Sequence, residues 1–315
     1  MQRTGRNGCV NALWFPFVMI GISLITAVPI LAASQITFAT PEAAVDALIA
    51  ANRDNDLTKL LAILGPDGEK LIHSGDSVAD RRGRKLFVAA YDEAHKLDRE
   101  GDDKAALIVG ADEWPLPIPL VRENAHWRFD TKAGADEILN RRIGRNELDV
   151  IEVCRAFVEA QHEYAAKRLG PNGAAEYAQH FMSRIGQRDG LYWPAKAGEE
   201  ESPLGPLIAR AQTAGYRPGT PHQRPRPYYG YYFHILTQQG PNAPGGAKDY
   251  VVNGRMTGGF ALIAYPATHG DSGIMTLIVN QDGIVYQKNF GPDTTNIAAR
   301  ITQYDPDASW QVTKP

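Results

Sequence analysis

A serine flanked by residues that often accompany a nucleophile occurs near the C-terminal end of the chain. Residues 269–273 read His-Gly-Asp-Ser-Gly, so Ser272 stands between an aspartate and a glycine, with His269 three residues earlier. A catalytic serine needs a base within hydrogen-bond distance of its hydroxyl, a carboxylate that orients this base, and donors for the oxyanion. The segment therefore raises the question whether Ser272 is a nucleophile or part of a turn.

The tetrapeptide Gly-Asp-Ser-Gly resembles the one that carries the nucleophile of the trypsin-like serine proteases. His269 is only three residues away, whereas the base of a nucleophile usually comes from elsewhere in the fold. Ile274 and Met275 follow where that family has a further glycine and a proline, and its small-residue segment around the catalytic histidine is missing. Glycines around Asp271 and Ser272 suit a tight connection between strands. We therefore expect a hairpin here and assign no catalytic residue.

Two further sets of side chains could do chemistry. His73, Asp76 and Asp80 fall within one short segment, but the two histidines on one helical face that are typical of a metal site are absent. We interpret these three residues as polar groups of a loop. Cys154 lies on an apolar helical stripe, which favours a small buried side chain over a thiol nucleophile. We expect neither a metal nor a cofactor.

Aromatic residues gather where the C-terminal strands are expected to begin. The segment RPRPYYGYYFHI places five aromatic rings beside two arginines. Because a strand alternates its side chains between two faces, one set of rings is expected in the core and the other at the surface. Exposed tyrosines with arginine are enriched at binding surfaces. The candidate binding surface is Arg226, Tyr229 and Tyr231, and the alternative is a core covered by a loop.

The composition is that of a globular protein with little net charge. The chain has 315 residues, of which 43% are hydrophobic and 22% charged, and its formal net charge is −3. Without a basic surplus, binding of nucleic acid through phosphates is not expected. The densest run of charge, at 80–85 (DRRGRK), is interpreted as a solvated turn.

The N-terminus has the pattern of an export signal. Two arginines and no acidic residue precede an apolar run at 12–33, which ends in small residues. This pattern predicts a signal peptide over 1–34, cleaved near Ala33 or Ser34, and a periplasmic or secreted protein without a membrane span after cleavage. The alternative is an uncleaved anchor, because the run approaches the roughly 20 residues that span a bilayer. Only Cys154 remains after cleavage, which excludes an internal disulfide.

The first half of the chain predicts helices followed by strands. Apolar residues recur at helical spacing from Thr40 onward, again over 57–64 and over 85–97, and the period then changes to two across 104–131. This order indicates a helix packed on a curved antiparallel sheet, so we expect an α+β domain over 35–135. The architecture resembles the nuclear-transport-factor-two-like and cystatin-like folds.

A second α+β domain is expected over 147–315, after a linker at 136–146. It opens with the strongest helical stripe of the chain, which a Gly-Pro pair ends. The dipeptide Asp282-Gly283 between alternating apolar residues predicts a hairpin. The other expected elements are a helix at 203–214 and strands at 228–239, 258–267 and 273–289.

Several long segments resemble an uncharacterised bacterial family, DUF2950. They include TPEAAVDALIAA, LLAILGPDGEKLI, EILNRRIGRNEL, RDGLYWP and GYYFHILTQQGPNAPGGAKDYVVNGRMTGGFALIAYPA, and together they run from about Thr40 to Asp307. The resemblance implies no activity, because the family has no established one.

The order of elements in the C-terminal half is also similar to the globular heads of type IV pilins and type II secretion pseudopilins. Those proteins have their assembly helix at the extreme N-terminus, whereas here a separate domain intervenes. Some pseudopilin heads bind calcium near the last hairpin, which would make Asp271 and Asp282 the ligands that the resemblance implies.

These observations favour an exported envelope protein that acts as a non-enzymatic interaction or assembly module with an envelope protein partner. The alternative is an extracytoplasmic hydrolase whose polar residues converge only in the fold. The interaction module requires an exposed binding surface in the tertiary structure. The hydrolase requires a nucleophile and its base within hydrogen-bond distance.

Overall fold

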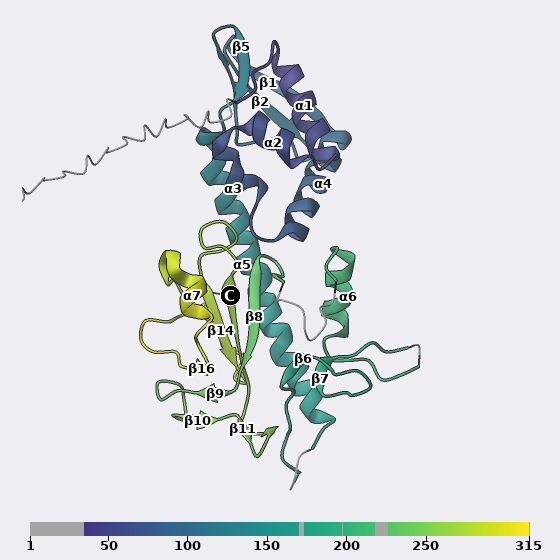
Figure 1. Ribbon diagram of the computed structural model, residues 1–315, viewed down its shortest axis with the longest axis vertical. Helices are drawn as coiled ribbons and strands as arrows, with labels where there is room; N and C mark the ends of the chain where they lie inside the picture. The colour runs from purple at the N-terminus through teal and green to yellow at the C-terminus, as the bar shows by residue number, and fades with distance from the viewer. Residues whose placement is uncertain (1–34, 170–172, 197, 218–225, 315) are drawn as a thin grey trace, which may run out of the picture. The chain divides into compact units, whose positions relative to one another are not determined.

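The computed structural model describes residues 35–169, 173–196, 198–217 and 226–314 (Figure 1). The predicted signal peptide at 1–34 lies outside the described residues. Within these ranges, no helix has both the length and the hydropathy that a membrane crossing requires.

The N-terminal half consists of helices followed by an antiparallel sheet. The sheet order is β1-β2-β4-β5, and β3 pairs with β2 beside this path. The helices are α1 (Pro41–Arg53), α2 (Leu57–Leu64), α3 (Glu69–Ile72) and α4 (Ser77–Glu93), with a 3-10 turn at Pro66–Gly68, and the strands are β1 (His95–Glu100), β2 (Lys104–Val109), β3 (Trp114–Pro115), β4 (Leu120–Glu123) and β5 (His126–Phe129).

Local sequence accounts for these elements. Thr40 caps α1 by accepting a hydrogen bond from the backbone N–H of Ala43, and Pro41 fits the first turn because its missing N–H has no helical partner. The buried face of α1 and the inward residues of β2 belong to one apolar core, to which Leu48 and Leu107 contribute. Helix and sheet thereby bury each other's apolar faces.

A single helix, α5 (Thr131–Ala166), passes through the expected linker at 136–146. The segment expected to connect the two domains is therefore helical. Ile138 packs against the N-terminal core, while Val150 and Phe157 lie in the core of the C-terminal half. Because apolar side chains continue at helical spacing and Glu137 pairs with Arg141 one turn later, the helix does not break between the two cores.

The C-terminal half is built on an antiparallel sheet with the order β17-β15-β14-β13-β8. Helix α5 contacts β13 and β14, and α7 (Thr294–Ala298) contacts β13. The sheet strands are β8 (Tyr231–Leu236), β13 (Ala261–Pro266), β14 (Thr276–Asn280), β15 (Tyr286–Lys288) and β17 (Gln311–Val312).

Shorter elements surround this sheet. Helix α6 (Gly205–Thr213) lies apart from it in the chain, between the strand pair β6–β7 and β8 (Figure 1). The short strands are β6 (His180–Met182), β7 (Gly190–Tyr192), β9 (Gln238–Gln239), β10 (Lys248–Asp249), β11 (Val251–Val252), β12 (Arg255–Met256) and β16 (Gln303–Tyr304), and a second 3-10 turn spans Gly291–Asp293.

The α+β class is confirmed. The hairpin predicted at Asp282-Gly283 is confirmed too, because β14 and β15 pair antiparallel on either side of it, with Thr276 opposite Lys288. The finer resemblances to the transport-factor, cystatin and pilin folds stay predictions.

Candidate functional site

The charged run at 80–85 is helical rather than a solvated turn, so that prediction was wrong. Asp76 explains the difference because it caps α4, its Oδ1 accepting hydrogen bonds from the backbone N–H groups of Val78 and Ala79, both at 3.1 Å. With its first turn satisfied, the helix begins before the charged run, and Arg81, Arg82 and Lys85 of this run are exposed on it.

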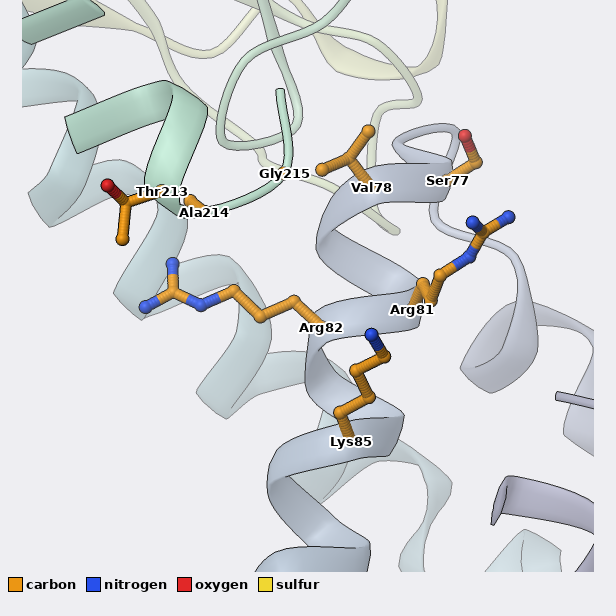
Figure 2. Close-up of a pocket in the computed structure, with 8 residues that line it drawn as sticks. All are labelled: Ser77, Val78, Arg81, Arg82, Lys85, Thr213, Ala214 and Gly215. Atoms are coloured by element: carbon orange, nitrogen blue, oxygen red, sulfur yellow. The ribbon is translucent and has the colours of Figure 1, made fainter. Parts of the chain in front are cut away.

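A pocket of about 360 Å³ opens beside this face (Figure 2). Its two walls come from the N-terminal turns of α4 and from the chain at the end of α6. In Figure 2, Arg82 reaches from α4 toward Thr213 and Ala214, and Lys85 lies one turn further along α4. The lining residues are Ser77, Val78, Arg81, Arg82, Lys85, Thr213, Ala214 and Gly215.

The pocket lining is positively charged. Arg81, Arg82 and Lys85 are exposed, and none of them forms an ion pair or a side-chain hydrogen bond within the described ranges. Among the described residues of the lining, none carries a carboxylate. Three like charges on consecutive turns of one helix repel each other, so an anion in the pocket would relieve an unfavourable interaction.

Arg82 of the pocket also acts on a carboxylate outside the lining, Asp149. Burial raises the pKa of the Asp149 carboxyl above its ordinary value, and the positive charges of Arg145, Arg210 and Arg82 partly offset this effect. Asp149 is thus one carboxylate facing several cations, and it does not neutralise the three that line the pocket. The local excess of positive charge contrasts with the formal net charge of −3 for the whole chain.

The two walls are connected through Asp76. Its Oδ2 accepts a hydrogen bond from the Tyr216 hydroxyl at 2.8 Å and from the backbone N–H of Gly230 at 2.9 Å. The Tyr216 hydroxyl oxygen also accepts the backbone N–H of Tyr229 at 3.2 Å. Burial and the Asp76 carboxylate both raise the pKa of Tyr216, which keeps this donor protonated. Asp76 therefore positions the chain after α6 relative to the start of α4.

The turn interpretation of Ser272 is confirmed. Strands β13 and β14 pair antiparallel on either side of it, and the fully buried Ser272 hydroxyl accepts from the Thr268 N–H and donates to the Thr268 carbonyl oxygen. His269 pairs with Asn289 through its Nε2, 3.0 Å from Oδ1. The Ser272 oxygen therefore lacks a hydrogen-bonded base in the described part of the chain.

The cluster of His73, Asp76 and Asp80 is also structural. Asp80 accepts a hydrogen bond from the backbone N–H of Ser74 at 3.0 Å, and His73 is exposed. Asp76 accepts four hydrogen bonds, so both carboxylates have structural partners. Within the described ranges, no group of three or more histidine, cysteine or acidic side chains could hold a metal.

The candidate surface of Arg226, Tyr229 and Tyr231 needs a correction at Tyr231. Tyr231 is fully buried, and its hydroxyl donates to the Met275 carbonyl oxygen at 3.0 Å. Tyr229 is half-buried in a turn with a φ of 51°, and Arg226 is exposed. Because strand alternation begins only at Tyr231, after this turn, the two tyrosines do not share a face.

Cys154 is buried as expected. Burial raises the pKa of its thiol to about 12, so the thiolate that a nucleophile requires is not populated near neutral pH.

Sequence reasoning missed the basic pocket. The run DRRGRK contains its three cations, and their spacing would place Arg81 and Lys85 on one helical face. To infer this shared face, one has to know that the helix begins before residue 80. The apolar residues at helical spacing, however, indicate a helix only from residue 85 onward. The opposite wall is distant in sequence.

No curated protein and no solved structure matches the chain. A family model described as Protein of unknown function (DUF2950) matches residues 35–313, which is nearly the whole of the described structure. The chain belongs to this family.

Proposed function

We propose that this chain is an exported protein of the bacterial envelope, which acts as a non-enzymatic interaction module and binds an anionic group of its partner in the basic pocket. The observation that carries the proposal is the set of three cations, Arg81, Arg82 and Lys85, in a pocket whose described lining residues include no carboxylate. The export signal predicted at 1–34 supports the location in the envelope.

Charge complementarity explains why such a pocket suits an interaction module. Cations at a rim steer an anionic partner and fix its register, and they contribute to specificity more than to raw affinity. Because the chain as a whole has a formal net charge of −3, the attraction comes from this local set of cations rather than from a general basic surplus. The proposed partner accordingly presents a localised negative charge.

The test is a crosslinked pull-down from the envelope fraction with the tagged full-length chain. The pocket variant changes Arg81, Arg82 and Lys85 to Gln, which removes the charge and retains side-chain length. The matched control changes Arg122, Lys132 and Arg300 to Gln, because these three cations are also exposed and lie outside the pocket lining.

The proposal predicts one partner in stoichiometric amount, retained by the control and lost by the pocket variant. Equal recovery by both variants, or recovery of no partner from correctly processed protein, would overturn it. Mass spectrometry of the same sample reads the mature N-terminus. A start near Ala33 or Ser34 supports cleavage, and an intact Met1 would show an anchor instead.

A further inference from the structure

We propose that the ligand of the basic pocket is a phosphate ester of a sugar-sized group, with the phosphate between Arg81, Arg82 and Lys85. The inference rests on the proposed function, because it names the chemistry of the anionic group that the pocket takes.

The first argument is charge. Three cations line one small volume, and Figure 2 shows the Arg82 side chain extending from α4 toward Thr213 and Ala214. A phosphomonoester carries about −1.5 to −2 charge at pH 7 and offers three acceptor oxygens. It can therefore engage both guanidinium forks and the ammonium group together. A single carboxylate carries one charge and two oxygens, which would leave part of this set unpaired.

The second argument concerns which groups supply the positive potential. The start of a helix attracts anions, but Asp76 already accepts the N–H groups of Val78 and Ala79. The helix end therefore adds little, and the side chains of Arg81, Arg82 and Lys85 carry the attraction. It follows that removing these charges should weaken binding strongly even though the helix remains.

The third argument is size and lining. The pocket volume of about 360 Å³ falls within the range of small-molecule sites, which is roughly 300–1,000 Å³, and it exceeds what an inorganic anion fills. Val78 and Ala214 supply apolar wall, and Ser77 and Thr213 add hydroxyl groups. An organic group the size of one sugar ring can use both kinds of surface.

The test is isothermal titration calorimetry of the mature chain with glucose 6-phosphate, with glucose and glucuronate as matched probes. Glucose lacks the anion, and glucuronate replaces the phosphate by a carboxylate on the same ring. We expect binding of glucose 6-phosphate, at least tenfold weaker binding of glucuronate, and no heat with glucose. The affinity should fall as NaCl is raised, because exposed charges are screened.

The variants used for the pull-down separate the possible results. The pocket variant should bind glucose 6-phosphate at least tenfold more weakly than the wild type, and the control variant should bind it equally well. Far-UV circular dichroism verifies that both fold. Equal binding by the pocket variant would overturn the assignment of the site, and equal affinity for glucuronate would overturn the preference for phosphate.

A vesicle arm identifies the source of the phosphate. Phosphatidylcholine vesicles with and without phosphatidic acid are sedimented with the protein. Binding to glucose 6-phosphate supports a soluble ester. Charge-dependent binding to phosphatidic acid vesicles alone overturns the sugar-sized group and assigns the phosphate to a lipid headgroup. Binding to neither probe overturns the inference. If the pocket variant still loses the partner in the pull-down, the proposed function stands, and only the assignment of the ligand as a phosphate ester is wrong.

Discussion

Asp76 and Gly230 are 154 positions apart in the chain, yet the Asp76 Oδ2 accepts the Gly230 backbone N–H at 2.9 Å. The same carboxylate caps α4 and accepts the hydroxyl of Tyr216, and its side chain is buried. One side chain thus satisfies four donors from three separate segments. It starts the helix that carries the pocket cations, and it holds the segment that forms the opposite wall.

Replacing Asp76 should therefore cost more than the loss of a helix cap. We expect Asp76→Ala to lower the free energy of unfolding by about 3 kcal/mol, because it removes the cap and leaves the Gly230 N–H buried without an acceptor. Urea unfolding measures the change. Asp56, the partly exposed cap of α2, is the matched control, and Asp56→Ala should cost only about 1 kcal/mol. Equal losses would show that the bonds to Gly230 and Tyr216 contribute nothing.

Two glycines of α5 should respond in opposite directions to the same substitution. A Cβ at Gly134 would lie 2.3 Å from the Pro117 carbonyl oxygen, whereas a Cβ at Gly144 would meet no atom within 4 Å. We expect Gly134→Ala to destabilise the protein by about 2 kcal/mol through overpacking. Gly144→Ala should stabilise it by about 1 kcal/mol, because alanine is the better helix former. Thermal unfolding measures the stability of both variants relative to the wild type. A Gly134→Ala variant as stable as the wild type would contradict the close packing at Gly134.

Ser272 should behave as a structural residue. A fluorophosphonate probe labels serines that have an activating base, and the Ser272 hydroxyl is buried and bonded to the backbone of Thr268. We expect no label on the native protein by mass spectrometry. Ser272→Ala should instead lower the free energy of unfolding by about 1 kcal/mol, through its two lost hydrogen bonds. Labelling that disappears in Ser272→Ala would restore the hydrolase alternative.

Cys154 should make stability fall at high pH. Its thiol has a pKa of about 12 in the folded protein, against an ordinary value of 9.0. Below pH 9 the thiol is protonated in both states, and the full contribution of its burial is present. Between these values the unfolded state binds fewer protons, so the contribution of Cys154 falls by about 1.4 kcal/mol per pH unit.

The variant Cys154→Ala isolates this contribution from those of the buried tyrosines. The difference in unfolding free energy between wild type and Cys154→Ala should shrink as the pH rises above 9. A difference that stays constant to pH 11 would show that the thiol is not desolvated. Ellman's reagent gives an independent check, since the native thiol should react only after denaturation.

Elements with strong local signals could be predicted from the sequence. The cap at Thr40, the alternation along β2 and the Asp282-Gly283 turn each depend on residues a few positions apart. The structural role of Ser272 could be predicted for the same reason, since its hydroxyl bonds to Thr268 within the same connection.

Predictions failed where a distant contact decides the outcome. Residues 136–146 have the polarity of a linker, but they stay helical because α5 is anchored in a core at each end. Tyr231 belongs to a segment whose tyrosines and arginines are typical of a binding surface. In the structure it is buried in the sheet, and its hydroxyl donates a hydrogen bond to the Met275 carbonyl oxygen.

The α+β class and the family could be inferred from the sequence alone, and the run DRRGRK that contains the pocket cations is visible there without its role. The tertiary structure was needed to place Arg81, Arg82 and Lys85 in the lining of the same pocket as Thr213. The physical reason is that the two walls meet through the hydrogen bond between Tyr216 and Asp76, 140 positions apart. Local propensity carries no information on such a contact, because it forms only when the chain between them has folded.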